Sequence, residues 1–429
     1  MEVIIAKGAD EMRKSQIWLR RALVLEVQIR ETQNQSISHQ EGYPLPLQNK
    51  GEKIISQMEE SGIIRKSVKM SNLSDRGSLR EVLWDVKAIQ SRNCFMRKHC
   101  LTIWERNSHL RRQCSLLNQS RGPADKTKLY HWKNLNYCKV PKGGSTYWMQ
   151  IFLALNNVKN ITDLFGKKRS LQHSYTMATI SWRNTAVTDV IFHVTRNPYS
   201  RLFSAYIDKI FLPGFWQLAM DINKRNGKRC NQPVSFEEFL KFILVYYLNE
   251  PHWQPISALC SSCTVPYNVI SKQETFNQDA HFILDQLNIS QNLKQYFLKN
   301  LQEKHTENSI KEITKVMSEY ARKASCISFL QFIKRLWKSF QIQGYISDSI
   351  PCPVHEFRSL NFYQIDGIVR ACLKATRKIH MTETMSDKQR QRHLARAFTS
   401  VSSKTIDVIR MTYKNDFEIF GYSYELPTG

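Results

Sequence analysis

The sequence contains no long apolar run. A stretch of about 18 consecutive apolar residues, the length that spans a bilayer as a helix, occurs nowhere in the 429 residues. The nearest approach, residues 17–27, is interrupted by Arg20, Arg21 and Glu26. The sequence as given therefore predicts neither a signal anchor nor a cleavable signal peptide.

Two short signatures are also missing. The triphosphatase signature G-x-x-x-x-G-K-S/T is absent, which argues against a kinase or NTPase. The ten cysteines are not grouped as the paired C-x-x-C units of a zinc array, and only Cys260 and Cys263 have that spacing. These two could form a tight disulfide or half of a zinc site, but without a second pair nearby we favour a structural role.

The sequence does carry a large excess of positive charge. Lys and Arg number 62 against 37 Asp and Glu, a formal net charge of +25. This excess predicts a partner or substrate rich in anionic groups, such as nucleic acid, an acidic glycan or a phosphorylated nucleotide. Because the excess is spread along the chain, a basic solvated surface explains part of it, and charge alone does not choose among the three.

The residue pattern divides the chain into two parts. Residues 1–125 are polar with weak helical periodicity, typical of a stem or a loosely structured N-terminal region. In residues 126–429, strand-like runs precede helix-like runs twice, at 135–157 and 187–210. This alternation predicts an α/β domain with a P-loop-like parallel sheet flanked by helices.

The second half of the chain is predicted to be mostly helical. Residues 236–249 have the spacing of an amphipathic helix. Residues 291–400 are basic and helical with an interruption at 350–353, which indicates a helical insertion or lid. The aromatic stretch 413–422 is too apolar for a free tail.

A first candidate phosphate site follows a predicted strand. The strand-like run 135–140 leads into P-K-G-G-S-T at 141–146 and then into a helix-like run. A glycine-containing loop at a helix start presents backbone N–H groups and a positive dipole end to an anion, and hydroxyl and ammonium groups strengthen that site. A polar strand-to-helix turn without a ligand is the alternative interpretation. The candidate phosphate-binding residues are Lys142, Gly143, Gly144, Ser145 and Thr146.

A second candidate site follows the next strand. Arg196 comes at the carboxyl end of the β-branched run 189–195, the edge where open α/β sheets bind ligands. Asn197 is a natural helix cap and Pro198 suits the first helical position. A guanidinium there can hold a phosphate in bidentate fashion, and Ser204 can add a hydroxyl. Alternatively, Arg196 is a surface ion-pair partner and Ser204 a small helix-packing residue.

These segments resemble a known family. Residues 137–148 and 192–209 resemble the 5′-phosphosulfate-binding loop and the 3′-phosphate-binding segment of sulfotransferases. The blocks at 252–267, 270–280 and 413–422 are similar to later blocks of the Golgi carbohydrate sulfotransferases, including the chondroitin, dermatan and HNK-1 type enzymes. Five blocks in the family's order are more specific than any single motif.

The resemblance implies an activity and a donor site. A sulfuryl group would move from 3′-phosphoadenosine 5′-phosphosulfate (PAPS) to a hydroxyl of a glycan or glycosaminoglycan by in-line displacement, with no metal and no nucleic-acid partner. Residues 142–146 would hold the 5′-phosphosulfate, Arg196 and Ser204 the 3′-phosphate, and Lys142 would stabilise the leaving phosphate. The alternative is a non-enzymatic heparin- or RNA-binding protein on a degenerate sulfotransferase scaffold, which the intact Lys142 and Arg196 disfavour.

The acceptor hydroxyl also needs a general base. His252 is the first candidate, because it follows a predicted helix and lies in a family-like block. A packed histidine that orders a loop beside Trp253 is the alternative. Glu274 and Asp208 are weaker candidates for the base, whereas His193 lies in a presumed buried strand and is predicted to be structural.

The sequence also departs from the family. Gly143, Gly144 and Ser145 stand where many relatives carry Val-Ala-Cys, residues 291–400 are longer than the family's equivalent, and the N-terminal anchor is not visible. The resemblance implies a type II membrane-associated enzyme in the Golgi lumen. We therefore expect an incomplete or alternative start, and the N-x-S/T sequons, such as Asn118 and Asn288, permit a secretory route.

Overall fold

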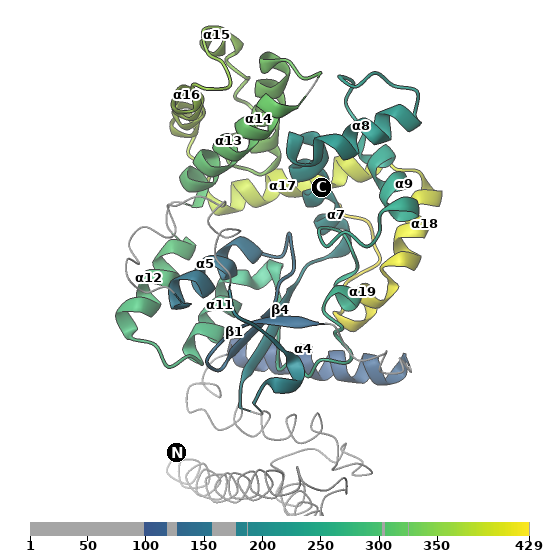
Figure 1. The fold of residues 1–429 in the computed structure, drawn as a ribbon, viewed down its shortest axis with the longest axis vertical. Helices are drawn as coiled ribbons and strands as arrows, with labels where there is room; N and C mark the ends of the chain where they lie inside the picture. Colours follow the sequence, from purple (N-terminus) through teal and green to yellow (C-terminus); the bar gives the residue numbers. More distant parts are fainter. Residues whose placement is uncertain are drawn as a thin grey trace, which may run out of the picture.

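The fold is described from a computed structural model of the chain (Figure 1). The described residues are 98–117, 127–156, 177–186, 188–302, 305–324 and 326–428. Of the predicted N-terminal region 1–125, only residues 98–117 are among them. The sequon at Asn118 lies outside the described residues.

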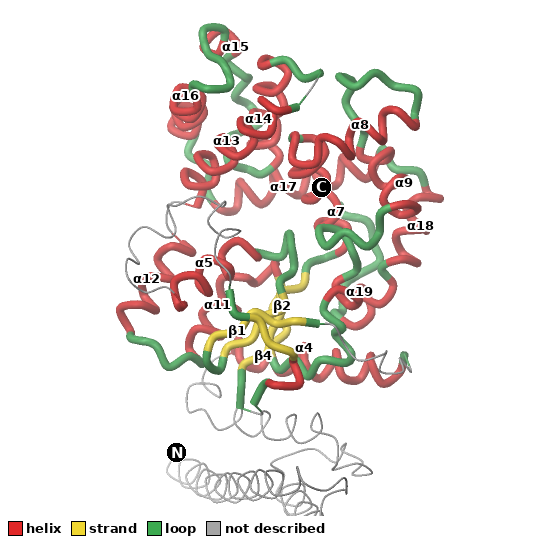
Figure 2. Tube along the Cα trace, in the orientation of Figure 1, coloured by secondary structure: helices red, strands yellow, loops and turns green. Residues whose placement is uncertain are grey.

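The centre of the fold is a five-stranded mixed sheet with strand order β3-β1-β2-β4-β5 (Figure 2). The strands β2, β4 and β5 are parallel, which confirms the predicted parallel βαβ core. The sheet as a whole is not purely parallel, because β1 pairs antiparallel with both of its neighbours, β2 and β3. Only a two-residue turn joins β1 to β2, and so short a connection forces antiparallel pairing. The strands are β1 (Lys128–Trp132), β2 (Leu135–Cys138), β3 (Thr179–Ser181), β4 (Val190–Thr195) and β5 (Val269–Lys272).

Both predicted strand-to-helix units form. The strand β2 leads into α5 (Ser145–Asn156), whose residues Trp148, Ile151 and Phe152 are buried on the sheet. The strand β4 is buried at all six positions and leads into α7 (Pro198–Tyr206). The side chain of Asn197 accepts hydrogen bonds from the N–H groups of Tyr199 at 3.0 Å and Ser200 at 3.4 Å, which confirms the predicted cap.

Helices cover both faces of the sheet (Figure 1). On one face pack α5, α11 (Phe276–Asp285) and α12 (Gln291–Gln302), which share one apolar core with β2 and β4. On the other face lies α19 (Lys414–Ile419), with Ile419 in a second core. The helix α4 (Lys98–Leu116) runs along β5 and contributes Ile103 to the first core and Leu110 to the second. The helix α4 comes from the predicted N-terminal region, yet it packs on β5 and α11.

The predicted helical region 291–400 is helical and has a core of its own beyond α12. The segment 351–353 is not helical, which confirms the predicted interruption. Whether the region is an insertion or a lid stays a prediction. Its helices after α12 are α13 (His305–Lys323), α14 (Phe329–Ile342), α15 (Val354–Phe357), α16 (Ile365–Lys378) and α17 (Glu383–Thr399).

Two more predicted segments are confirmed. The amphipathic run 236–249 forms α9 (Phe236–Tyr246), with Ser235 as its cap. Tyr413, Phe417 and Phe420 of the final aromatic stretch are buried. The helices α8 (Trp216–Arg225) and α18 (Ser403–Thr412) share one apolar core with α9.

Three disulfides join distant parts of the described chain: Cys114–Cys263, Cys138–Cys260 and Cys230–Cys326. The alternative of a tight Cys260–Cys263 bridge is therefore wrong, because the two thiols meet partners on different elements, and the structural role is confirmed. Within the described ranges, no group of three or more His, Cys, Asp or Glu side chains is arranged to hold a metal ion. None of the described helices combines the length and the apolar character needed to cross a bilayer.

Candidate functional site

The loop between β2 and α5 is shaped by its two glycines. The backbone φ is +69° at Lys142 and +77° at Gly144. A Cβ on Gly144 would lie 2.3 Å from a ring carbon of Phe276, and one on Gly143 would lie 3.0 Å from the carbonyl oxygen of Val194. The loop therefore runs against the end of β4, and Ser145 opens α5 directly behind it, as an anion site of this type requires.

The close approach at Gly144 gives a stability prediction. We expect Gly144→Ala to lower the free energy of unfolding by about 2–5 kcal/mol, from a left-handed alanine (about 1–2) and an overpacked contact (about 1–3). Gly227 is the matched control, because it has a φ of +66° but a Cβ added there would meet no atom within 4 Å. Urea unfolding would measure both alanine variants, and equal losses would contradict a role for the Phe276 contact.

Arg196 joins the two predicted phosphate sites. Its Nη1 donates to the backbone carbonyl of Lys142 at 2.9 Å, and its Nε donates to Ser200 Oγ at 3.0 Å. Burial lowers the pKa of Arg196 to about 10, and the positive charge of Arg390 on α17 acts in the same direction. The guanidinium therefore stays cationic at neutral pH, at the carboxyl edge of the sheet where both loops meet. Ser204 is half-buried on α7, and its predicted contact with phosphate stays a prediction.

Lys142 is held by a carboxylate from the π-helical turn Ile207–Phe211, which directly follows α7. Its Nζ lies 3.0 Å from Asp208 Oδ2, and Nζ of Lys209 lies 3.4 Å from the same oxygen. All three side chains are only about one-sixth exposed, at 15%, 15% and 16%. Asp208, a weaker candidate for the general base, thus serves in this state as the counter-ion of two lysines.

His252 lies in the turn after α9. Its Nδ1 is 2.5 Å from Glu250 Oε1, and its ring meets the Phe215 ring edge-on with centroids 5.2 Å apart. The Nζ of Lys209 lies 4.8 Å from the centre of the Phe215 ring. Because Lys209 and Lys142 both contact Asp208, this connects the His252 turn to Lys142. Burial, followed by the charge of Lys209, lowers the pKa of His252 to about 4, although Glu250 opposes the shift. The imidazole is therefore neutral at pH 7, the state that a proton acceptor needs.

A buried arginine joins the loop after β2 to the turn that carries His252. Arg201 is 2% exposed. Its guanidinium donates to the carbonyls of Pro141 at 3.2 Å, Pro251 at 2.8 Å and Gln254 at 2.6 Å. Sequence reasoning missed this residue. The available signal was an arginine on the stripe of α7 shared with Pro198 and Ala205, a stripe that faces the core.

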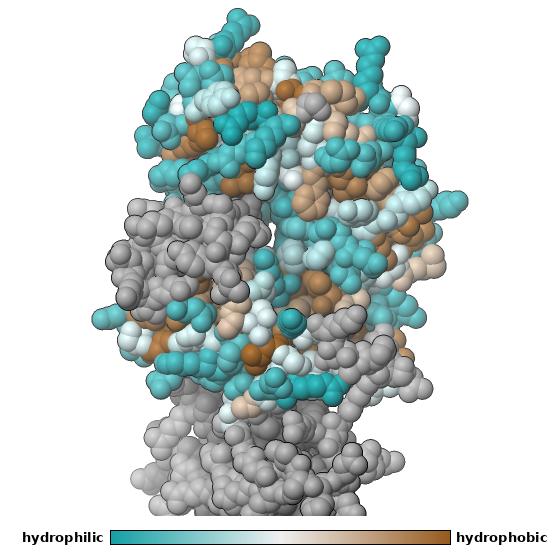
Figure 3. Space-filling model, viewed as in Figure 1, coloured by the Kyte–Doolittle hydropathy of each residue, from teal (hydrophilic) through white to brown (hydrophobic). Residues whose placement is uncertain are grey.

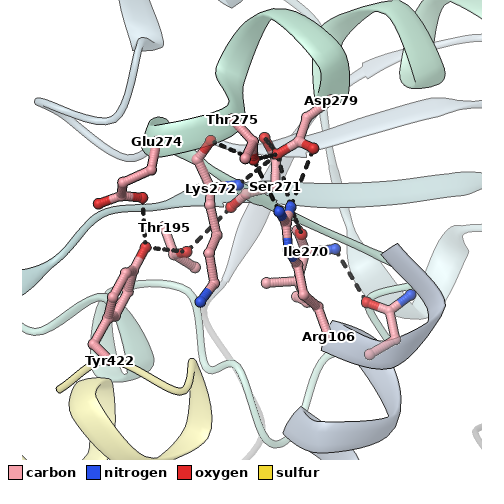
Figure 4. Close-up of polar contacts among 10 residues, drawn as sticks. Arg106, Thr195, Ile270, Ser271, Lys272, Glu274, Thr275, Asp279 and Tyr422 are labelled. Atoms are coloured by element: carbon pink, nitrogen blue, oxygen red, sulfur yellow. Dashed lines mark hydrogen bonds and ion pairs between the residues drawn. The ribbon is translucent and has the colours of Figure 1, made fainter. Parts of the chain in front are cut away.

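Glu274 lies beside Tyr422 of the C-terminal segment (Figure 4). Its carboxylate accepts hydrogen bonds from the backbone N–H of Asn197 and from the hydroxyl of Tyr422, both at 3.1 Å. The same hydroxyl lies 2.9 Å from Thr195 Oγ1. Glu274, the other weaker candidate for the base, therefore ties the start of α7 to the C-terminal segment.

A buried ion pair supports the segment that carries Glu274 (Figure 4). Arg106 of α4 donates to both carboxylate oxygens of Asp279, at 2.9 and 3.1 Å, and to Thr275 Oγ1 at 2.9 Å. Asp279 also accepts from Ser271 Oγ at 2.9 Å and from the N–H of Lys272 at 2.7 Å. No sequence signal indicated Arg106, because α4 lies in a region predicted to be loosely structured.

His193 is structural, as predicted. It lies in β4 and is fully buried, and burial lowers its pKa to about 3.

On the face drawn in Figure 3, the surface is hollowed between the part built on the sheet and the helical part above it.

The sequence matches a described family and several curated relatives. The pattern of the "Sulfotransferase family" matches residues 129–340, which include both phosphate loops and the His252 turn. Human carbohydrate sulfotransferase 9 is 27% identical over 190 residues, covering 40% of this chain and 42% of the relative. Human carbohydrate sulfotransferase 8 is 27% identical over 177 residues, covering 37% and 41%. Mouse carbohydrate sulfotransferase 11 is 27% identical over 185 residues, covering 37% and 52%.

The aligned part of the chain thus spans about two fifths to one half of the length of these relatives. No solved structure matches the chain.

Proposed function

We propose that this chain, whose residues 129–340 match the sulfotransferase family and which is similar to carbohydrate sulfotransferases, transfers a sulfuryl group from PAPS to a hydroxyl of a glycan or glycosaminoglycan. The observation that carries this proposal is the contact of 2.9 Å between Arg196 Nη1 and the carbonyl of Lys142. It brings a loop suited to a 5′-phosphosulfate and a cation suited to a 3′-phosphate to one edge of the sheet. PAPS carries two phosphate-bearing positions, and this pair of sites fits both.

Sulfuryl transfer requires positive charge at a fixed position in the site. In an in-line transfer, negative charge develops on the bridging oxygen of the leaving nucleotide, so preorganised cations and N–H groups stabilise the transition state. Lys142 would turn from Asp208 to the donor, and Lys209, 3.4 Å from Asp208, would keep that carboxylate neutralised. Residues 143–146 would position the sulfate through N–H and hydroxyl groups.

Donor binding can be tested by thermal shift, with adenosine 3′,5′-bisphosphate (PAP) compared with ATP and Mg²⁺. Stabilisation by PAP, without stabilisation by ATP and Mg²⁺, would support the proposal. Stabilisation by ATP only with Mg²⁺ would indicate a nucleotide triphosphatase. Binding of heparin or RNA, but of neither nucleotide, would support the non-enzymatic alternative.

Arg196 gives a prediction for donor affinity. We expect Arg196→Ala to weaken PAP binding by about 2–4 kcal/mol, since the 3′-phosphate loses its charge-assisted partner. Calorimetry would measure the change, with Arg370→Ala on the exposed face of α16 as the control. Unchanged affinity in the Arg196 variant would remove this residue from the site.

We further propose His252 as the general base, with Glu250 as its positioning partner. A carboxylate 2.5 Å from Nδ1 favours the tautomer with the proton on Nδ1, so Nε2 is left to accept the proton of the acceptor hydroxyl. The positions of Lys209 and Phe215 support this assignment, because they connect the His252 turn to Lys142.

The pair of His252 and Glu250, here called the dyad, gives a kinetic prediction. Glu250→Gln removes the charge that raises the pKa of His252, so the imidazole becomes a weaker base. We expect kcat to fall about 10- to 100-fold while PAP affinity is unchanged. Steady-state kinetics with saturating PAPS would show the effect, and a variant with wild-type kcat would exclude the dyad.

The proposed location is the Golgi lumen. Three disulfides within the described residues support an oxidising compartment. The exposed sequon at Asn288 offers a readout, because only a lumenal chain receives a glycan there. A cytosolic product with free thiols would contradict this location.

A further inference from the structure

The end of α9 carries exposed side chains that the core does not use. The buried stripe of this helix is formed by Phe236, Phe239, Leu240 and Ile243. Immediately after that stripe, Val245 is 68% exposed, Tyr246 57% and Tyr247 49%. Single exposed apolar residues are ordinary, but contiguous large ones mark a binding surface.

A guanidinium is stacked on this aromatic surface. The Cζ of Arg225, at the end of α8, lies 4.2 Å from the centre of the Tyr246 ring and 5.6 Å from that of Phe242. The rings of Phe242 and Tyr246 are themselves 5.4 Å apart. In the part of the chain that the structure describes, Arg225 forms no ion pair with a carboxylate. The aromatic contacts thus hold the guanidinium in place, and its N–H groups can bind an anion.

Positive side chains outnumber negative ones near Arg225 in sequence, where Asp221, one turn earlier on α8, is the acidic neighbour. Lys224 and Arg229 are exposed on either side of it in sequence, and neither forms an ion pair within the described ranges. The two glutamates that open α9 are already neutralised by lysines. These pairs are Glu238 with Lys228 at 2.6 Å and Glu237 with Lys241 at 3.0 Å.

This surface adjoins the turn that carries His252. The indole Nε1 of Trp253 donates to the carbonyl of Tyr247 at 2.7 Å, and the two rings are 6.4 Å apart. Trp253 directly follows His252 in the chain, so a group bound on Tyr247 lies close to the His252 turn.

We propose that Arg225, Tyr246 and Tyr247 form a subsite for an acidic sugar of the acceptor, next to the sugar that receives the sulfate. This inference rests on the proposed function. The exposed parts of the two tyrosine rings offer apolar surface to the C–H groups of a sugar, and the guanidinium offers a bidentate partner to a carboxylate or sulfate ester. The acceptor is therefore a polyanionic glycan rather than a neutral one.

The test compares polymers that differ only in charge. Unsulfated chondroitin and unsulfated heparosan carry one carboxylate per disaccharide, and their carboxyl-reduced forms carry none. We expect the wild-type chain to bind at least one acidic polymer about tenfold or more tightly than its reduced form, and Arg225→Gln to abolish that difference. Tyr246→Ala should weaken binding of both forms. Arg370→Gln, an exposed arginine on α16, is the matched control and should behave as wild type.

The outcomes separate the subsite from the enzyme. PAP binding and thermal midpoint are measured on the same samples, and both should be unchanged in the three variants. Equal affinity of wild type for acidic and reduced polymers, or wild-type binding by Arg225→Gln, would overturn the subsite while PAP binding still supports the transferase. Failure of the wild-type chain to bind PAP would instead overturn the proposed function.

Discussion

Lys142→Ala is expected to lower the rate of sulfation by at least ~100-fold, because it removes the cation that would stabilise the leaving phosphate in the transition state. The fold should survive the change. The Lys142 ammonium contacts Asp208 at 3.0 Å, and Asp208 keeps Lys209 at 3.4 Å when Lys142 is lost, so no carboxylate is left without a cation. Initial rates with radiolabelled PAPS would measure the effect.

Two further variants make this prediction specific. Lys142→Arg keeps the charge and should recover part of the rate, whereas Lys128→Ala, an exposed lysine on β1, should change nothing. If Lys142→Ala turned over at the wild-type rate, the assigned role of Lys142 would be wrong.

Arg106→Ala is expected to lower the free energy of unfolding by about 3–5 kcal/mol, because it leaves the buried carboxylate of Asp279 without its cation. The ion pair measures 2.9 Å, and the Asp279 side chain is 0% exposed. Donor affinity should fall as well, since Asp279 also accepts from the N–H of Lys272 and so holds the segment that carries Glu274.

Arg112→Ala is the matched control, because Arg112 is exposed on the same helix. Urea unfolding followed by tryptophan fluorescence would compare the two variants. Equal stability of Arg106→Ala and wild type would show that α4 does not support the site.

The local structure of the two candidate phosphate loops could be predicted because each is specified by neighbouring residues. A buried strand, a turn with glycine or a helix cap, and an apolar helical stripe all lie within about one βα unit of sequence. The structure confirms these local elements, including the cap at Asn197. The backbone of the proposed donor site could therefore be predicted from the sequence.

The residues that hold these loops together could not be predicted, because their partners are distant in sequence. Arg201 reaches Pro251 across 50 positions and Arg106 reaches Asp279 across 173. Glu250 was overlooked for a different reason, since a glutamate two residues from a histidine is common and only the 2.5 Å contact makes it significant. The antiparallel strands β1 and β3 were missed because they are short and half-exposed.

The arrangement of the bridges Cys114–Cys263 and Cys138–Cys260 has a consequence for oxidative folding. The second bridge closes a loop nested inside the first, and both end on cysteines only three positions apart. An unfolded chain has little basis for choosing between Cys260 and Cys263, so swapped partners should form readily and must be corrected by thiol–disulfide exchange. Only the assembled sheet with α4 packed against it distinguishes the two thiols. The yield of correctly bridged protein should therefore depend on a disulfide isomerase.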